Sequence, residues 1–114
     1  MSSMNRISYT HHFKNRAKRL HKKFASLRND VAKLEEKLLA TPKLGESLGA
    51  GLYKIRLVVE SKGGGKSGGF RLITYLLEER SDGIDIFFIT LYDKSEDATI
   101  QKQSLLALIK DIDG

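Results

Sequence analysis

Lysine, arginine and tyrosine side chains gather in two stretches of this 114-residue chain. Lys54 and Arg56 stand two apart in "LYKIRL", and Tyr92 and Lys94 stand two apart in "LYDK". Alternation along a strand places residues two apart on one face. Arg71 follows a glycine-rich loop and could grip a phosphate with two hydrogen bonds. These residue types predict binding of a phosphate backbone, with a solvated strand face or a carboxylate-bound arginine as the alternatives.

The glycine-rich loop "ESKGGGKSGGFR", residues 60–71, contains Gly65-Lys66-Ser67, the ending of a phosphate-binding P-loop. A P-loop needs a glycine where this chain has Glu60, and it needs a helix after the serine. The residues after Ser67 read as a strand, so nucleotide binding is not predicted. The loop is either a flexible hairpin tip or a basic loop in which Lys62 and Lys66 reach a polyanion such as RNA.

The cysteine and histidine content of the chain excludes several kinds of catalytic and metal site. The chain has no cysteine, which excludes disulfides, thiolate metal sites and a cysteine nucleophile. Its three histidines, His11, His12 and His21, all fall in a predicted helical region and lack the spacing of a helical metal pair. We expect them to be exposed helix positions. No metal and no cofactor is predicted.

Charge is distributed unevenly along a chain whose net charge is +6. Residues 1–40 carry ten Lys/Arg against three Asp/Glu, whereas residues 81–114 carry three against seven. Lys14, Lys18 and Lys22 recur at helical i, i+4 spacing, where like charges disfavour an isolated helix. A contact with ribosomal RNA or a solvated helix face would each explain them.

The hydrophobic pattern predicts one α+β domain over residues 1–114. We expect a strand at 5–10, a helical stripe from Phe13 to Leu38 with a break near residue 25, and Ser26 as a helix cap. Three antiparallel strands follow at 52–60, 70–78 and 83–92, with a turn at 81–83, and then a short helix at 100–112. Residues 41–51 read as a polar connection, and all helices are expected on one sheet face. No apolar run could cross a bilayer and no signal peptide is evident, so a cytoplasmic protein is predicted.

Two linked motifs resemble the RelE/HigB group of the RelE/ParE superfamily of toxins from type II toxin–antitoxin systems. The first runs from "LYKIRL" through the glycine-lysine loop into "GGFRLITY", and the second is "FFITLYDKSED". Glycine-lysine loops followed by Gly-Gly-x-Arg make the HigB-like branch the closer match. The order of predicted elements agrees over nearly the whole chain.

The resemblance implies a small microbial-ribonuclease-like fold and a ribosome-dependent mRNA endonuclease that inhibits translation. It implies a cognate antitoxin, expected to be a small helix-turn-helix protein, with mRNA and the ribosome as the other partners and no membrane contact. Carried over by position, the catalytic set is Lys54, Arg56, Arg71, Tyr92 and Lys94, and the RNA- or ribosome-binding set is Lys62, Lys66, Lys14, Lys18 and Lys22. RelE-like members carry a further tyrosine where this chain has "EDATIQ", so the general base stays open. A ParE-like inhibitor of DNA gyrase and a non-catalytic RNA-binding protein are the alternative functions.

Overall fold

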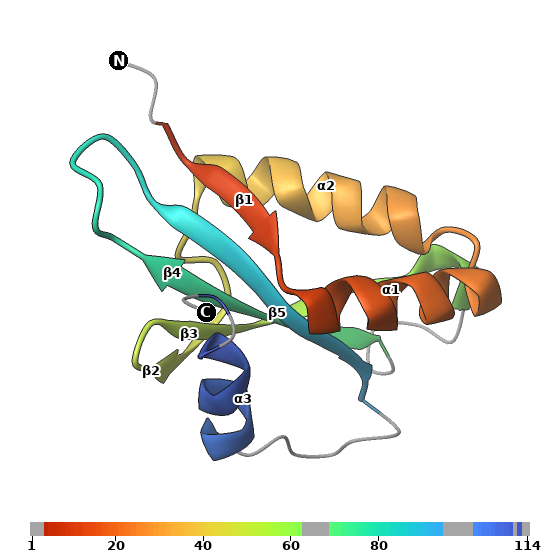
Figure 1. The fold of residues 1–114 in the computed structure, drawn as a ribbon. Helices are drawn as coiled ribbons and strands as arrows, with labels where there is room; N and C mark the ends of the chain where they lie inside the picture. The colour runs from red at the N-terminus through yellow and green to blue at the C-terminus, as the bar shows by residue number, and fades with distance from the viewer. Residues whose placement is uncertain (1–3, 63–68, 95–101, 111, 113–114) are drawn as a thin grey trace.

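The computed structural model describes residues 4–62, 69–94, 102–110 and 112 (Figure 1). The elements in chain order are β1 (Arg6–Tyr9), α1 (His11–Lys23), α2 (Leu27–Ala40), β2 (Glu46–Gly49), β3 (Leu52–Leu57), the 3₁₀ turn η1 (Glu60–Lys62), β4 (Phe70–Leu77), β5 (Asp85–Asp93) and α3 (Lys102–Ile109). The predicted α+β class is confirmed. None of the helices in the described part of the chain has the length and apolar character needed to cross a membrane.

The strands form one five-stranded sheet in the order β1-β5-β4-β3-β2. The predicted antiparallel meander is confirmed as β3, β4 and β5, and β1 joins β5 in parallel. Strand β2 was not expected, because residues 41–51 had been interpreted as a connection. It is a short edge strand antiparallel to β3, and the tight turn between them holds Gly49, Ala50 and Gly51 all at positive φ.

Helices cover both faces of the sheet, so the prediction that they share one face was wrong. In Figure 1, α1 and α2 lie above the sheet and α3 lies below it. Strands β4 and β5 carry apolar side chains on both faces, and their alternate residues belong to two separate hydrophobic core clusters. Leu38, Leu72 and Phe88 belong to the cluster under α1 and α2. Leu105 of α3 packs with Ile73 in the second cluster.

The predicted break in the helical stripe is confirmed between Lys23 and Leu27. Ser26 occupies the position before α2, but its hydroxyl caps no backbone amide there. It donates instead to the buried Asp30 carboxylate at 2.7 Å, and it accepts from the Ser61 amide at 2.8 Å. The amide of Glu60 donates to the same carboxylate at 3.2 Å. This Ser26–Asp30–Ser61 network fastens η1, and with it the start of the glycine loop, to the helix turn.

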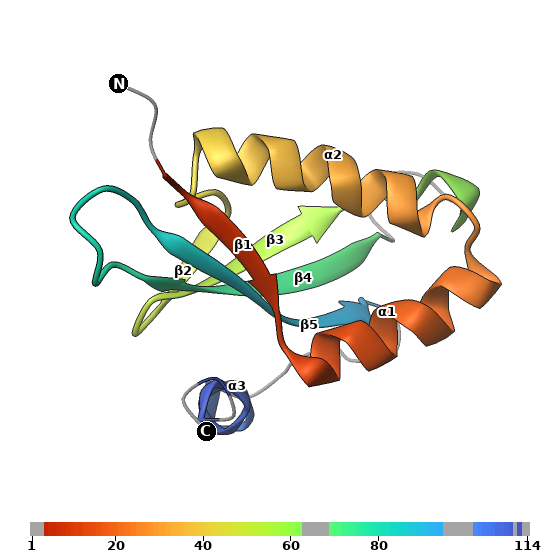
Figure 2. The same ribbon diagram turned by 45° about the horizontal axis from the view of Figure 1, so that its top comes forward.

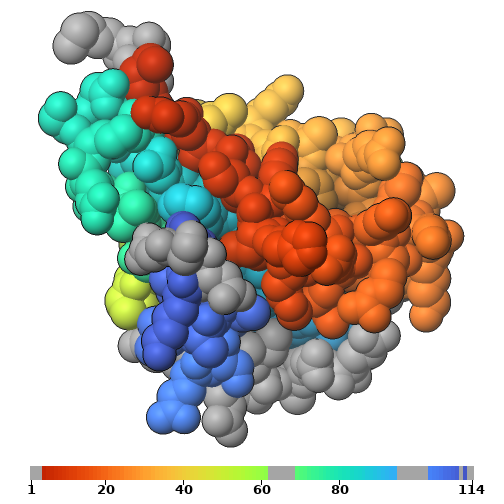
Figure 3. Space-filling model, viewed as in Figure 1, coloured from red at the N-terminus to blue at the C-terminus, as the bar shows by residue number. Residues whose placement is uncertain are grey.

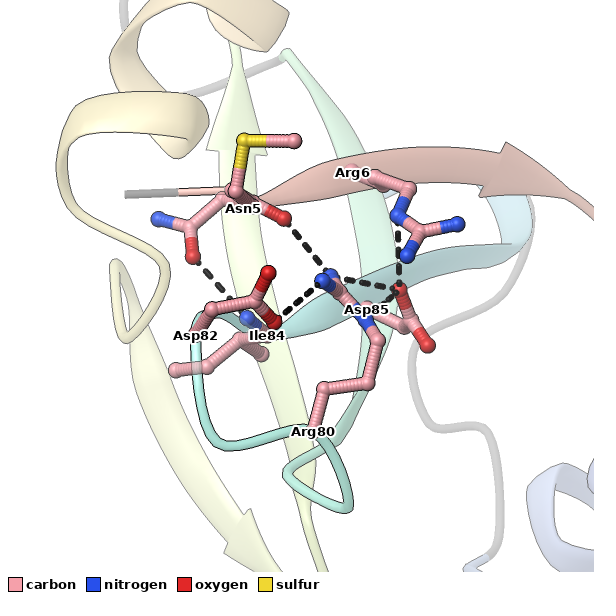
Figure 4. Close-up of polar contacts among 7 residues, drawn as sticks. Asn5, Arg6, Arg80, Asp82, Ile84 and Asp85 are labelled. Carbon is pink, nitrogen blue, oxygen red and sulfur yellow. Dashed lines mark hydrogen bonds and ion pairs between the residues drawn. The ribbon is translucent and has the colours of Figure 1, made fainter. Parts of the chain in front are cut away.

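The first strand is held at the sheet edge by Arg80, which lies after β4 (Figure 4). Its guanidinium donates to the Met4 carbonyl at 2.6 Å and to the Asp85 carboxylate at 2.9 Å. It also pairs with Asp82 at 3.0 Å, within the predicted turn between β4 and β5. Among the described residues, this arginine contacts carboxylates and a backbone carbonyl, which is the usual pattern for a structural cation.

Candidate functional site

All five predicted catalytic residues line one cavity of about 290 Å³ on the sheet face that also carries α3. A sixth lining residue, Glu46, was not predicted. The full lining is Glu46, Lys54, Arg56, Arg71, Tyr92 and Lys94. Four cations, one carboxylate and one phenol therefore surround a single small space, contributed by β2, β3, β4 and the end of β5.

Strand register explains how the cavity is assembled. Arg56 lies directly opposite Arg71, and Arg71 lies directly opposite Tyr92. Directly opposed side chains in antiparallel strands have Cβ atoms about 4.5–5.5 Å apart, and like charges in such pairs are unfavourable. The two guanidinium groups thus form a cationic pair that an anion between them would stabilise.

Arg71 is buried, with 9% of its surface exposed. One guanidinium nitrogen donates to the carbonyl of Phe70 at 3.3 Å. Among the described residues, no carboxylate forms an ion pair with it. The alternative of an arginine bound to a carboxylate therefore finds no support in the described part of the chain, in contrast to Arg80.

Glu46 enters the cavity because β2 can approach β3 closely. Gly45 has a φ of 97°, and a Cβ at this position would lie 2.5 Å from the carbonyl oxygen of Lys54. Only glycine permits both the conformation and the approach. The next residue, Glu46, is then paired opposite Lys54 across the edge of the sheet. A signal for this was present in the sequence: a Gly-Ala-Gly turn joins an acidic residue to the predicted strand.

The two described ends of the glycine loop are held by contacts with other parts of the fold. The first residues of the loop form η1. Near its other end, the carbonyl of Gly69 accepts from the Lys94 amide at 3.3 Å. Strand β4 begins at Phe70, so no helix follows the loop, and the exclusion of a P-loop is confirmed. Lys66 and the side chain of Lys62 lie outside the described structure, and their predicted contact with RNA stays a prediction.

Helix α1 secures the strand that carries Tyr92 and Lys94. The Thr10 hydroxyl accepts from the Phe13 amide and donates to the Ile89 carbonyl at 2.9 Å. Arg16 Nε donates to the Leu91 carbonyl at 2.5 Å. These contacts occupy carbonyls of β5 beyond the end of β1, and they brace the strand up to the cavity.

The prediction that all three histidines are exposed was wrong. His11 is exposed, but His12 is half-buried and hydrogen-bonds the Thr90 hydroxyl at 2.9 Å. Burial, followed by the positive charges of Arg16 and Arg19, lowers the pKa of His12. His21 has a buried Nδ1 with no hydrogen-bond partner among the described residues. None of the three lines the cationic cavity.

The helix lysines are separated from the predicted catalytic set. Lys14, Lys18 and Lys22 are exposed on α1 and line a different cavity, between α1 and α2. Phe13 and Leu27 of this second cavity belong to the core cluster on the opposite sheet face from Ile73 and Tyr92. The structure thus divides the predicted binding residues between two surfaces.

Fold and site together define a small α+β protein with a cationic cavity on its sheet. The chain matches the family model of the RelE toxin of the RelE/RelB toxin–antitoxin system over residues 5–112. It therefore belongs to the RelE toxin family, and the predicted superfamily is confirmed. Membership implies a toxin that is paired with an antitoxin, whereas assignment to the HigB-like branch remains a prediction.

Proposed function

We propose that this toxin is a ribosome-dependent mRNA endonuclease that inhibits translation by a metal-independent reaction. The observation that carries the proposal is the opposed pair Arg56 and Arg71, placed in a cavity with two lysines. Paired guanidinium groups suit a phosphate that gains negative charge in its transition state. Family membership supports the same activity.

The reaction needs neither metal nor added water. The ribose 2′-oxygen attacks the adjacent phosphorus while the 2′-proton passes to a base. The bond from phosphorus to the 5′-oxygen breaks, and that oxygen takes a proton from an acid. The products are a 2′,3′-cyclic phosphate and a 5′-hydroxyl end, so atoms and charge balance with general acid and base groups alone.

Strand order suggests the role of each residue. The phosphate sits over Arg56 and Arg71 on the two central cavity strands. Glu46 supplies the one carboxylate among the six lining residues, and a carboxylate is a common general base, so we assign that role to Glu46. Glu46 is on β2 and Lys94 is at the end of β5, on opposite sides of the arginine pair. This order matches in-line displacement, with Lys94 as the acid.

Lys54 and the glycine loop bind the substrate. Lys54, opposite Glu46, holds the phosphate, whereas the ring of Tyr92 is 4% exposed and packs in the second cluster at the cavity wall. Lys62 and Lys66 of the glycine loop extend the contact to the RNA backbone or to the ribosome. The ribosome presents the mRNA in the cavity, and this positioning contributes much of the rate.

A reporter mRNA translated with the purified toxin tests the function, with primer extension to map the cuts. We expect cleavage with translating ribosomes and little with the naked mRNA. Equal cleavage of both would contradict ribosome dependence. No cleavage, combined with loss of DNA gyrase supercoiling, would establish the ParE-like alternative. Salt-dependent RNA binding with neither effect would establish the non-catalytic one.

The loop lysines have their own test. The double variant Lys62→Ala, Lys66→Ala should bind ribosomes more weakly and, once ribosomes are saturating, cleave at nearly the wild-type rate. A variant that binds ribosomes normally but fails to cleave would show that the loop takes part in the chemistry.

A further inference from the structure

Helices α1 and α2 diverge from their shared turn across one face of the sheet (Figure 2). Between them lies an open groove of about 670 Å³. Its floor is apolar, with Phe13 and Ala17 contributed by α1 and Leu27 and Val31 contributed by α2. Helix α1 forms a large part of the molecular face seen in Figure 3. Ala17 and Val31 are half-buried, so they give the α1–α2 groove apolar surface that a ligand can reach.

Cations surround this apolar floor. Lys14, Lys18 and Lys22 line it from α1, and Arg28 lines it from α2. All four are exposed, and none forms an ion pair with a carboxylate among the described residues. A ligand for the groove must therefore combine apolar side chains with negative charge.

The acidic residue of the groove lining is already engaged. Glu35 accepts a hydrogen bond from the Tyr9 hydroxyl. Burial first, and then the bond to Glu35 and its charge, raise the pKa of Tyr9 to about 12. The phenol thus stays a donor to Glu35, and this single carboxylate leaves the groove lining with an excess of positive charge.

A buried polar atom on the groove wall also lacks a partner. His21 lines the groove, and its Nδ1 has no hydrogen bond among the described residues. A buried polar atom without a partner is costly, but a ligand resting on the groove surface does not reach an atom that has no exposed area.

We propose that the α1–α2 groove is the docking site for an amphipathic helix of the antitoxin, with an apolar stripe flanked by Asp and Glu. An amphipathic helix in a groove buries its apolar face, and its flanking carboxylates meet the lysines and Arg28. RNA would supply the charge but would leave the apolar floor uncovered. The lysines expected to contact ribosomal RNA thus belong to a protein-binding surface.

The position of the groove adds a consequence. The groove lies on the sheet face covered by α1 and α2, whereas the cationic cavity lies on the face covered by α3. A helix docked in the groove anchors the antitoxin without touching Arg71. The proposal depends on the toxin–antitoxin family and is independent of the endonuclease activity.

The test uses the protein encoded by the reading frame adjacent to this gene, purified separately from the toxin. Titration calorimetry then compares wild type with Ala32→Glu and Lys18→Glu, two exposed positions in the groove lining. We expect each variant to weaken binding about 10- to 100-fold. Lys37→Glu, an exposed α2 position outside the groove lining, is the matched control and should bind as wild type does.

Unchanged affinity in both groove variants would overturn the proposal, as would absence of binding by the wild-type toxin. Lys18→Glu that loses ribosome affinity but keeps antitoxin affinity would assign the groove to RNA instead. Equal weakening by Lys37→Glu would reduce the effect to net charge and overturn the proposal too. Thermal melting of each variant establishes that the changes in binding are not caused by unfolding.

Discussion

The two faces of the sheet differ in what their side chains contact. On the face covered by α1 and α2, Ile55 and Leu57 of β3 are buried in the core cluster. On the other face, Lys54 and Arg56 of the same strand line the cationic cavity. Strand alternation therefore lets β3 contribute adjacent residues to the core and to the cationic cavity. Substitutions on one face are expected to leave the property of the other largely intact.

The arginines show the same contrast. Arg80 pairs with Asp82 and Asp85 and anchors β1 through the Met4 carbonyl. Arg71 is buried opposite Arg56 and has no described carboxylate partner. A structural cation is neutralised within the fold, whereas a cation kept beside another cation is ready for an anionic ligand.

The largest expected effect is on the rate of cleavage when Glu46 is changed. Glu46→Gln removes the proposed base while keeping size and polarity, and we expect cleavage to fall about 100- to 10,000-fold. Glu36→Gln, an exposed α2 change outside both cavities, is the control. Single-turnover cleavage of ribosome-bound mRNA measures both. Full activity of Glu46→Gln would place the base elsewhere.

On the opposite face, the expected loss is of stability. Leu38 is fully buried whereas its neighbour Leu39 is 40% exposed. Leu38→Ala should lower the free energy of unfolding by about 2–5 kcal/mol through lost burial and a residual cavity. Leu39→Ala should cost far less. Urea denaturation measures both, and similar costs for the two leucines would contradict the assigned core.

A smaller loss of stability is expected at the helix turn. Asp30 is buried and accepts from the Ser26 hydroxyl and the Glu60 amide. Asp30→Ala leaves these donors without their acceptor and should cost about 1–3 kcal/mol. Asn29→Ala, at an exposed neighbouring position, is the control. Protease cleavage within residues 60–69 should accelerate in Asp30→Ala alone, and unchanged cleavage would argue against anchoring of the loop.

The smallest effect is a pH dependence from His12. Burial, then Arg16 and Arg19, lower its pKa, so the folded state favours the neutral ring. The unfolded chain takes up a proton below pH about 6.5, so the stabilisation present above that pH is lost as the pH falls toward the folded pKa. Melting temperatures at pH 7.5 and 5.5 should therefore separate less in His12→Gln than in wild type. An equal separation in both proteins would contradict the lowered pKa.

Sequence reasoning predicted the fold where patterns are strong and local. The break in the helical stripe and the strands β3 to β5 follow from periodicity. Strand β2 escaped prediction because it has only four residues, and its pairing depends on the close approach that Gly45 permits. The placement of α3 on the second face depends on Leu105 meeting Ile73, a tertiary contact that no local pattern reveals.

The lining of the cationic cavity was predicted in part, because strand alternation is also a strong local pattern. Alternation placed two residues of one strand on one face. The resemblance to the toxin family indicated which residues of other strands belong to the same set. Glu46 was missed because its position depends on the unpredicted β2. The α1 lysines were predicted to contact RNA from their spacing and charge, and that prediction was made without the apolar groove floor contributed by Leu27 and Val31.

Arg71 has no carboxylate partner among the described residues, and we propose that it serves the reaction and not the fold. Single-turnover cleavage of ribosome-bound mRNA, measured beside thermal melting, tests it with Arg71→Ala and with Arg19→Ala, an exposed α1 control outside both cavities. We predict at least about a 100-fold loss of cleavage in Arg71→Ala at an unchanged melting temperature, with Arg19→Ala cleaving as wild type does. Cleavage by Arg71→Ala at the wild-type rate, or loss of cleavage only together with unfolding, would contradict the claim.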